Sequence, residues 1–205
     1  MSRQNRRKAA MRRRQRRRLI TGICIAALVL ALTGLAVWLI TDRKPELVTQ
    51  RYPMEMAAEV RMYAGQNELA PAYVASVILA ESSYDPNALS PANAQGLMQL
   101  LPETAEWIAG KLGETYSEGC LYDPDANMRY GCWYLSFLMR RYHNDMRLAS
   151  AAYHAGQGAV DKWLQNPEYA PDGVTLKTIP SSATDTYVQR VLKYYEKYDE
   201  LYAVA

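Results

Sequence analysis

The feature that most constrains this chain is an uncharged apolar run, LITGICIAALVLALTGLAVWLI, at residues 19–40. A helix of this length can cross a hydrocarbon core of about 30 Å. A cleaved signal peptide is the competing interpretation, but its apolar region is only about 7 to 15 residues long and ends at a small-residue cleavage site. Because this run is longer and ends in VWLI, we predict an uncleaved transmembrane helix over residues 19–40.

Basic residues are concentrated before this predicted span. Ten of the 24 Lys and Arg residues precede residue 19, and an excess of Lys and Arg fixes that end of a span in the cytoplasm. We therefore expect residues 1–18 to be a basic cytoplasmic segment of a single-pass protein of the cell membrane, with the rest extracytoplasmic. That rest has 14 basic and 21 acidic residues, a net charge of −7, which argues against nucleic acid as a partner.

The remainder of the chain predicts a short linker and one helical domain. Residues 41–53 are polar and contain two prolines, which is typical of a linker. Residues 54–205 show helical periodicity, and alternating strand patterns are hard to find, so the fold class should be mainly α. Start and stop signals predict helices at 54–65, 71–82, 102–113, 123–142, 145–156, 159–164 and 184–202.

Glu81 ends an apolar stripe in the second of these helices. Val74, Val77, Ile78 and Glu81 fall at i, i+3, i+4 and i+7, so the carboxyl group should face the protein interior. Desolvation and the negative end of the helix dipole would both raise its pKa, and a carboxylic acid protonated near neutral pH is what a general acid requires. From position alone, a buried glutamate satisfied by a cap or an ion pair is an equally good interpretation.

The segment that follows has no charged residue from Asn87 to Pro102, but it is rich in turn formers and amides. We expect a loop that lines an uncharged site. Ser90 and Gln99 offer hydrogen bonds to a neutral polyhydroxy or amide-bearing ligand, and Gly96 permits a close backbone approach.

Other kinds of site find little support in the sequence. The only histidines are His143 and His154, without a cluster of metal-ligand spacing, so neither a metal nor a cofactor is expected. No base is placed to activate a serine or cysteine nucleophile. Cys120 and Cys132 would lie in an oxidising compartment, where a disulfide and two free thiols are both open possibilities.

A longer motif gives the site a family context. The pattern E-S-x-Y-x-P-x-A-x-S-P-x-x-A-x-G-L-M-Q-L-x-P-x-T runs from Glu81 to Thr104 and resembles the signature of the soluble-lytic-transglycosylase (SLT) catalytic domain, which is related to goose-type lysozyme. Further matching blocks follow in order at 123–135 (DPDANMRYGCWYL), 149–160 (ASAAYHAGQGAV) and 179–195 (IPSSATDTYVQRVLKYY). The resemblance implies a lysozyme-like helical fold.

The same resemblance implies cleavage of the β-1,4 bond between N-acetylmuramic acid and N-acetylglucosamine in peptidoglycan. Glu81 would protonate the glycosidic oxygen and then, as a carboxylate, take a proton from the muramoyl C6 hydroxyl, which closes a 1,6-anhydro ring. One carboxylate suffices in substrate-assisted families. Asp85, Glu103 and Glu106 are close in sequence, but they are better interpreted as turn and first-turn helix residues.

Five further positions carry over as substrate-binding candidates. Ser90, Met98 and Gln99 match family positions that line the cleft near the acid, although Met98 is also a plausible core residue. Tyr153 matches the tyrosine of the family block A-Y-N-A-G, which approaches the catalytic glutamate. His154 stands in place of the asparagine of that block and introduces a ring that titrates near neutrality.

Other matches and departures bear on how well the site would work. Asp123, Asn127 and Gly131 match positions expected to be structural. Many members read E-T-R-x-Y-V where this chain has Ala183 in place of the glutamate and Asp185 in place of the arginine. Three alternatives therefore stay open: a hydrolytic muramidase with the same glutamate, a non-catalytic peptidoglycan-binding scaffold, and an anchored component of an envelope assembly with unknown partners.

Overall fold

The computed structural model describes residues 29–35, 38 and 50–202, and the chain divides after Arg51. The expected cytoplasmic segment 1–18, and most of the expected span 19–40 and linker 41–53, lie outside the described residues. The described part of the span, 29–35 and 38, is helical. Within the described ranges, no helix is both long enough and apolar enough to cross a membrane.

From Tyr52 onward the chain is helical, so the predicted mainly α fold class is confirmed. Between residues 50 and 202 the only β pairing is a pair of isolated bridges, Leu89 to Gln95 and Gln95 to Leu100. The elements are α2 (Ala57–Gln66), α3 (Pro71–Glu81), α4 (Pro102–Leu112), the 3₁₀ helix η1 (Cys120–Tyr122), α5 (Pro124–Arg141), α6 (Met146–Ala155), α7 (Gln157–Leu164) and α8 (Ser182–Tyr202).

Proline and glycine signals locate most helix boundaries correctly. Pro71, Pro102 and Pro124 each open a helix, because a missing N–H costs nothing in the first turn. Three expected starts differ from the structure: α2 begins at Ala57 and not at 54, α7 at Gln157 and not at 159, and α8 at Ser182 and not at 184. Gly156 alone turns the chain, with φ 82°, so Gly158 is an ordinary helical residue within α7.

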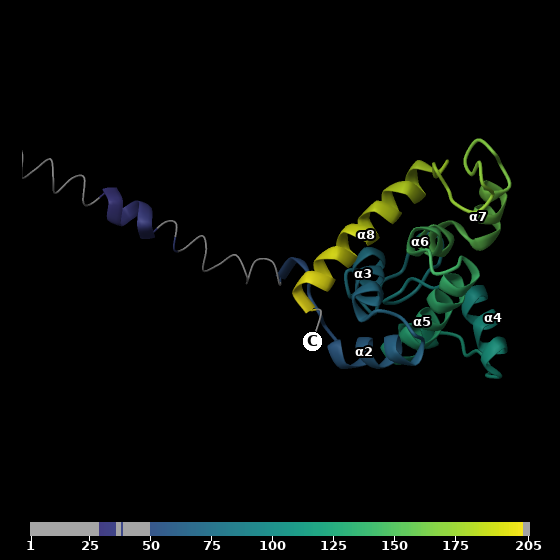
Figure 1. Cartoon of the computed structure of the whole chain (residues 1–205). Helices are drawn as coiled ribbons and strands as arrows, with labels where there is room; N and C mark the ends of the chain where they lie inside the picture. Colours follow the sequence, from purple (N-terminus) through teal and green to yellow (C-terminus); the bar gives the residue numbers. More distant parts are fainter. Residues whose placement is uncertain (1–28, 36–37, 39–49, 203–205) are drawn as a thin grey trace, which may run out of the picture. The chain divides into compact units, whose positions relative to one another are not determined.

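The third helix, α3, is the centre of the domain. Every residue from Ala72 to Ile78 is buried, because α3 packs against α2 and α8, while α8 also packs along α6 (Figure 1). A stripe at helical spacing along α8 predicts core packing: Tyr187, Val191, Tyr194, Tyr198 and Leu201. Tyr187, Val191 and Tyr198 are buried as predicted, Tyr194 is partly exposed, and Leu201 is exposed. The middle of α3 is therefore fixed by contacts on nearly all sides, whereas its last three residues, which include Glu81, are partly exposed.

The two cysteines of the described domain are free thiols. Cys120 lies in η1, and Cys132 is completely buried in α5. Burial raises the pKa of the Cys132 thiol to about 12, which keeps it protonated and unreactive. Of the two possibilities left open by the sequence, the structure has the free thiols.

Candidate active site

Glu81 is the last residue of α3 and is partly buried. Its pKa is raised to about 7, and desolvation is the largest cause, because burial penalises the charged carboxylate more than the neutral acid. This is the direction that the helical pattern predicts. At neutral pH both the acid and the carboxylate are populated, so the group can donate a proton and later accept one.

Two residues of α8 oppose this shift. The Tyr187 hydroxyl lies close enough to Glu81 to lower the carboxyl pKa, and the positive charge of Arg190 lowers it further. The Tyr187 hydroxyl is buried, yet it has no partner at normal hydrogen-bond geometry in the structure. An unpaired buried hydroxyl facing a carboxyl group is free to hydrogen-bond as the carboxyl ionises. Sequence reasoning assigned Tyr187 only to the core, although it lies within the last matching block.

Tyr153 connects Glu81 with the loop that follows it. Its hydroxyl donates a hydrogen bond of 2.8 Å to the carbonyl oxygen of Met98. Burial raises the pKa of Tyr153 well above 10, and the charge of Glu81 adds to the effect. Tyr153 is therefore a neutral phenol beside the candidate acid.

A single buried amide holds the loop in place. The Asn127 side chain in α5 accepts a hydrogen bond from the Met98 N–H at 2.8 Å and donates to the carbonyls of Gln95 and Leu121 at 2.9 and 2.8 Å. Both of its N–H donors and its carbonyl oxygen are hydrogen-bonded, and such bonds are costly to disturb in a buried position. Asn127 therefore has the structural role expected of it, because it holds the loop against α5 and η1.

Two glycines allow the loop and α5 to meet. Gly96 has φ 73°, and a Cβ there would overlap the Leu121 carbonyl and the Asn127 amide. A Cβ at Gly131 would overlap the Met98 sulfur. Met98 is completely buried, so its side chain is a core group, and of the two roles expected for Met98 the structure favours the core one.

The two polar loop candidates lie in different environments. The Ser90 hydroxyl accepts a hydrogen bond from the Ala94 N–H and stabilises the loop itself. Gln99 donates to the carbonyls of Ala88 and Gly96, with its backbone at φ 48°. Gln99 also lines the cleft. Because both of these bonds use its amide nitrogen, its amide oxygen can accept a hydrogen bond from a ligand.

His154 lies in the last turn of α6, where α6 meets α8. Its Nδ1 atom is 3.2 Å from the Thr184 hydroxyl, and its ring lies 4.6 Å from that of Tyr187. His154 remains exposed as a residue, but partial burial of the ring and the charge of Arg190 lower its pKa from the ordinary 6.5. His154 therefore contacts Tyr187, which in turn faces Glu81.

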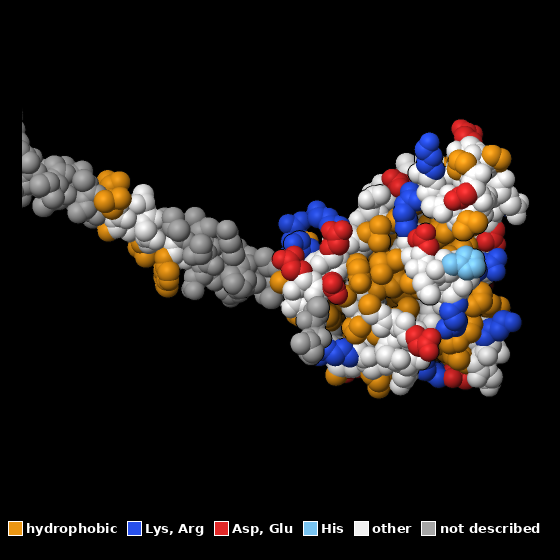
Figure 2. All heavy atoms as spheres, viewed as in Figure 1, with side chains coloured by type: hydrophobic (Ala, Val, Ile, Leu, Met, Phe, Trp, Pro, Cys, Tyr) orange, Lys and Arg blue, Asp and Glu red, His pale blue; other side chains and the backbone are white. Residues whose placement is uncertain are grey.

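A cleft of about 240 Å³ brings several of these residues together. Figure 2 shows hydrophobic side chains gathered over the middle of the domain, with charged side chains mainly around them. An uncharged cleft of this kind suits a neutral ligand. It is lined by Gln99, Leu100, Leu101, Thr104, Tyr134, Tyr153, His154, Ala155 and Gly156.

The other carboxylates near Glu81 in sequence do not form a pair with it. Asp85 is exposed, and its carboxylate accepts the Asn87 N–H within a turn. Glu103 and Glu106 are exposed on α4. Among the described residues, no three His, Cys, Asp or Glu side chains come together as a metal site would require.

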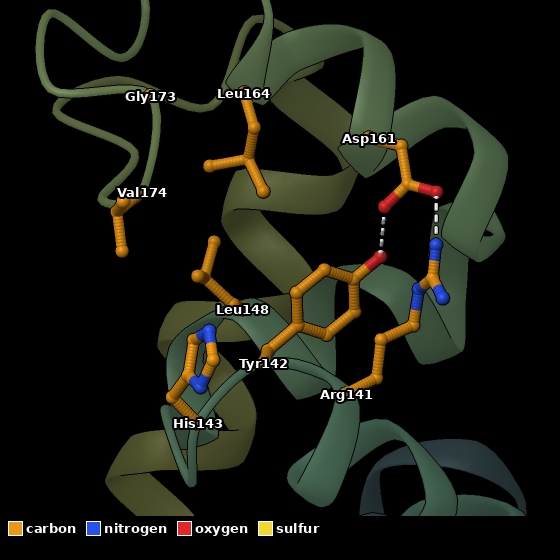
Figure 3. A pocket seen from close by; sticks show the side chains of 8 residues that line it. All are labelled: Arg141, Tyr142, His143, Leu148, Asp161, Leu164, Gly173 and Val174. Atoms are coloured by element: carbon orange, nitrogen blue, oxygen red, sulfur yellow. Dashed lines mark hydrogen bonds and ion pairs between the residues drawn. The ribbon is translucent and has the colours of Figure 1, made fainter.

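A separate pocket of about 310 Å³ lies at the carboxyl end of α5 (Figure 3). Three of its polar side chains bond to each other: Asp161 accepts from Arg141 at 2.6 Å and from the Tyr142 hydroxyl at 2.9 Å. It shares no lining residue with the cleft beside Tyr153. Because its charges are already paired, its polar groups serve the contact between α5 and α7.

Comparison with known proteins follows this geometry. Residues 59–173 match the family described as the transglycosylase SLT domain. Over 148 residues the chain is 34% identical to the soluble lytic murein transglycosylase of Escherichia coli K12, covering 71% of this chain and 23% of that protein. It is 32% identical to the membrane-bound lytic murein transglycosylase C of Actinobacillus pleuropneumoniae, covering 68% and 44%.

Solved structures agree in fold. An inactive glutamate-to-glutamine mutant of lytic transglycosylase Slt from Pseudomonas aeruginosa superposes with a TM-score of 0.68 at 34% identity, covering 77% of this chain and 26% of that one. A 70-kDa soluble lytic transglycosylase in complex with bulgecin A gives 0.67 at 30% identity, covering 75% and 25%. The chain thus spans about a quarter of the length of these relatives. With more than half of its residues in the family match, and with the fold shared, this chain belongs to the transglycosylase SLT domain family.

Proposed function

We propose that this chain is a membrane-anchored peptidoglycan lytic transglycosylase that cleaves the β-1,4 bond between N-acetylmuramic acid and N-acetylglucosamine and leaves 1,6-anhydro-muramoyl ends. The observation that carries this proposal is Glu81, a partly buried carboxyl group with its pKa raised to about 7. Glu81 does not itself line the uncharged cleft, but its charge acts on Tyr153, which does. The relatives named as lytic murein transglycosylases support the substrate class.

In the proposed reaction Glu81 acts twice. The protonated acid gives its proton to the glycosidic oxygen as the bond from that oxygen to the muramoyl C1 breaks. The resulting carboxylate takes the proton of the muramoyl C6 hydroxyl, whose oxygen bonds to C1 and closes the anhydro ring. Tyr187, near the carboxyl group, is placed to stabilise the carboxylate between the two steps, and Glu81 ends the cycle protonated.

A mechanism with two carboxylates has less support. Hydrolases of that kind place two carboxyl groups about 5 to 10 Å apart across the scissile bond. Asp85, Glu103 and Glu106 are exposed residues of a turn and of α4, and the pKa shifts of Glu81 do not arise from any of them. The N-acetyl group of the substrate can take the place of a second carboxylate at the anomeric carbon.

Mass spectrometry of the products tests the reaction. Purified protein incubated with cell-wall sacculi should release muropeptides with anhydro ends, which are one water lighter than hydrolysis products. Products one water heavier would show a muramidase that uses the same glutamate. Binding to sacculi without release of any fragment would favour a peptidoglycan-binding scaffold, an alternative that Ala183 and His154 keep open.

Anchoring through residues 19–40 is a second part of the proposal. It rests on the long apolar run and the arginines before it, and a membrane-bound relative makes it reasonable. Deleting residues 1–40 should move the protein from the membrane fraction to the supernatant and leave activity on sacculi unchanged. A truncated protein that stays in the membrane fraction would contradict the proposed anchor.

A further inference from the structure

The cleft beside Tyr153 adjoins a second pocket, to which the proposed reaction assigns no role. Thr104 and Tyr134 line the cleft, and both also line a pocket of about 270 Å³ together with Glu103, Trp107 and Gln157. The two pockets therefore share a wall made by α4 and α5. A ligand that fills the first and continues past Tyr134 reaches Trp107.

Aromatic side chains make the far end of this surface rigid. Trp107 meets Trp133, Tyr134 and Phe137 edge to face, with ring centroids 5.6, 6.1 and 5.4 Å apart. Trp133 and Phe137 stack on each other at 5.7 Å. We call these four residues the aromatic platform. It holds two of the four tryptophans of the chain and its only phenylalanine.

The platform is not sealed inside the protein. Trp107, Trp133 and Phe137 are all partly exposed, and only Tyr134 is buried. Partly exposed tryptophans that hold one another in place present a preorganised apolar surface. The exposed Lys111 side chain lies over the Trp107 ring, with its Nζ atom 5.7 Å from the centroid, and a ligand that stacks on that face displaces it. The platform contributes to packing between α4 and α5, but packing alone does not require an open pocket beside Trp107.

The second pocket has the side-chain chemistry of a sugar site. Sugar rings have apolar C–H faces that suit aromatic rings, and hydroxyl groups around the edge that need hydrogen-bond partners. Around Trp107 the pocket offers a carboxylate acceptor from Glu103, a hydroxyl from Thr104 and an amide from Gln157. Glu103 and Trp107 are four residues apart, so they lie on the same face of α4.

We propose that the aromatic platform is a further glycan subsite, in which a sugar ring of the strand stacks on Trp107 at a distance from the bond cleaved at Glu81. This deepens the proposed function and rests on it for the identity of the ligand. Because the two pockets share a wall, the sugar bound in the second pocket belongs to the same glycan strand that lies in the cleft. The subsite makes the protein prefer long strands to short ones.

Binding to strands of two lengths tests the subsite. The full chain carrying Glu81→Gln, purified in detergent, is titrated by calorimetry with peptide-free glycan strands, a tetrasaccharide and an octasaccharide. Adding Trp107→Ala should weaken octasaccharide binding about tenfold, equivalent to about 1.4 kcal/mol, and leave tetrasaccharide binding unchanged. An equal loss for both lengths, or no loss for the octasaccharide, would overturn the subsite.

Two variants guard against a merely structural effect. Gln157→Ala leaves the aromatic platform intact and should weaken only octasaccharide binding, by a few-fold. Trp163→Ala removes a partly exposed tryptophan of α7 that lines neither pocket, and it should change neither affinity. If Trp107→Ala fails to fold, Gln157→Ala decides, and unchanged octasaccharide binding by that variant counts against the subsite.

The outcome is separable from that of the proposed function. Binding by Glu81→Gln needs no catalysis, whereas the release of anhydro products by the unmutated chain does. Length-dependent binding without any product would contradict the lytic reaction and keep the subsite. Length dependence that appears only with peptide-bearing strands would show that the platform binds stem peptides, which overturns its assignment to sugar.

Discussion

The two sides of Glu81 are stabilised in different ways. On one side the loop is fixed by buried groups: Asn127 makes three hydrogen bonds, and Met98 packs against Gly131. On the other side, α6 and α8 bring an exposed histidine and an unpaired tyrosine hydroxyl next to each other. The loop side sets geometry, and the helix side partly lowers a carboxyl pKa that burial raises.

This difference also separates the parts of the chain that follow the family pattern from those that depart from it. The loop side carries the long matching motif from Glu81 to Thr104. The helix side carries all three departures: His154, Ala183 and Asp185. Burial raises the pKa of Glu81, and Tyr187 and Arg190 of α8 lower it in part. Departures near these two residues should therefore affect the pH dependence of activity more than the fold.

Glu81→Gln removes the carboxyl group that lies between the two sides, and it should have the largest effect on activity. The amide keeps the size of the side chain but has no proton to transfer, so kcat should fall by about a thousandfold or more. The free energy of unfolding should not decrease, because desolvation of an ionisable group is removed. Product release from sacculi measures the loss of activity, and thermal unfolding measures the change in stability. Activity within tenfold of the original would contradict the assignment of Glu81.

Asn127→Ala tests the loop side. Buried N–H and carbonyl groups of Met98, Gln95 and Leu121 would lose their partner, so the free energy of unfolding should fall by about 3 kcal/mol. Thr184→Val is the matched change on the helix side, and its cost should be about 1 kcal/mol. Urea unfolding of both variants compares them. Equal losses would show that the two sides do not differ in this way.

Tyr187→Phe tests the helix side directly. Removing a hydroxyl that has no regular partner should cost less than about 1 kcal/mol of stability. Since that hydroxyl lowers the pKa of Glu81, its loss should raise the pKa above about 7. The acid would then stay protonated to higher pH, and the alkaline limb of kcat/KM should move to higher pH. A limb that is unmoved would show that Tyr187 does not act on Glu81.

His154→Asn should have the smallest effect. The pKa of His154 lies below 6.5 in the folded protein, so protonation favours the unfolded chain, and stability is lost as the pH falls below about 6.5. The asparagine variant should lack this part of the pH dependence, both in thermal unfolding and in kcat/KM. Identical pH profiles of kcat/KM for the two proteins would show that ionisation of His154 does not affect the reaction.

Local signals predicted the existence of each α-helix of the domain and the buried position of Glu81, but not every helix start. First-turn prolines located the starts of α3, α4 and α5, and the apolar stripe through Val74 and Ile78 placed Glu81 toward the interior. Tyr187 was predicted only as a core residue, because helical spacing reports which face is buried and not which side chain faces it. The same limit applied to Met98, for which burial against Gly131 decided between two expected roles.

The sequence by itself determined the helical class and the family motif, and it placed Glu81 on the buried face of its helix, because helical periodicity and motif residues are read directly along the chain. Only the tertiary structure decided that Asn127 holds the loop, that Tyr187 faces Glu81, and that Trp107 continues the cleft. These three are contacts between segments far apart in the sequence, and their formation depends on how the helices pack.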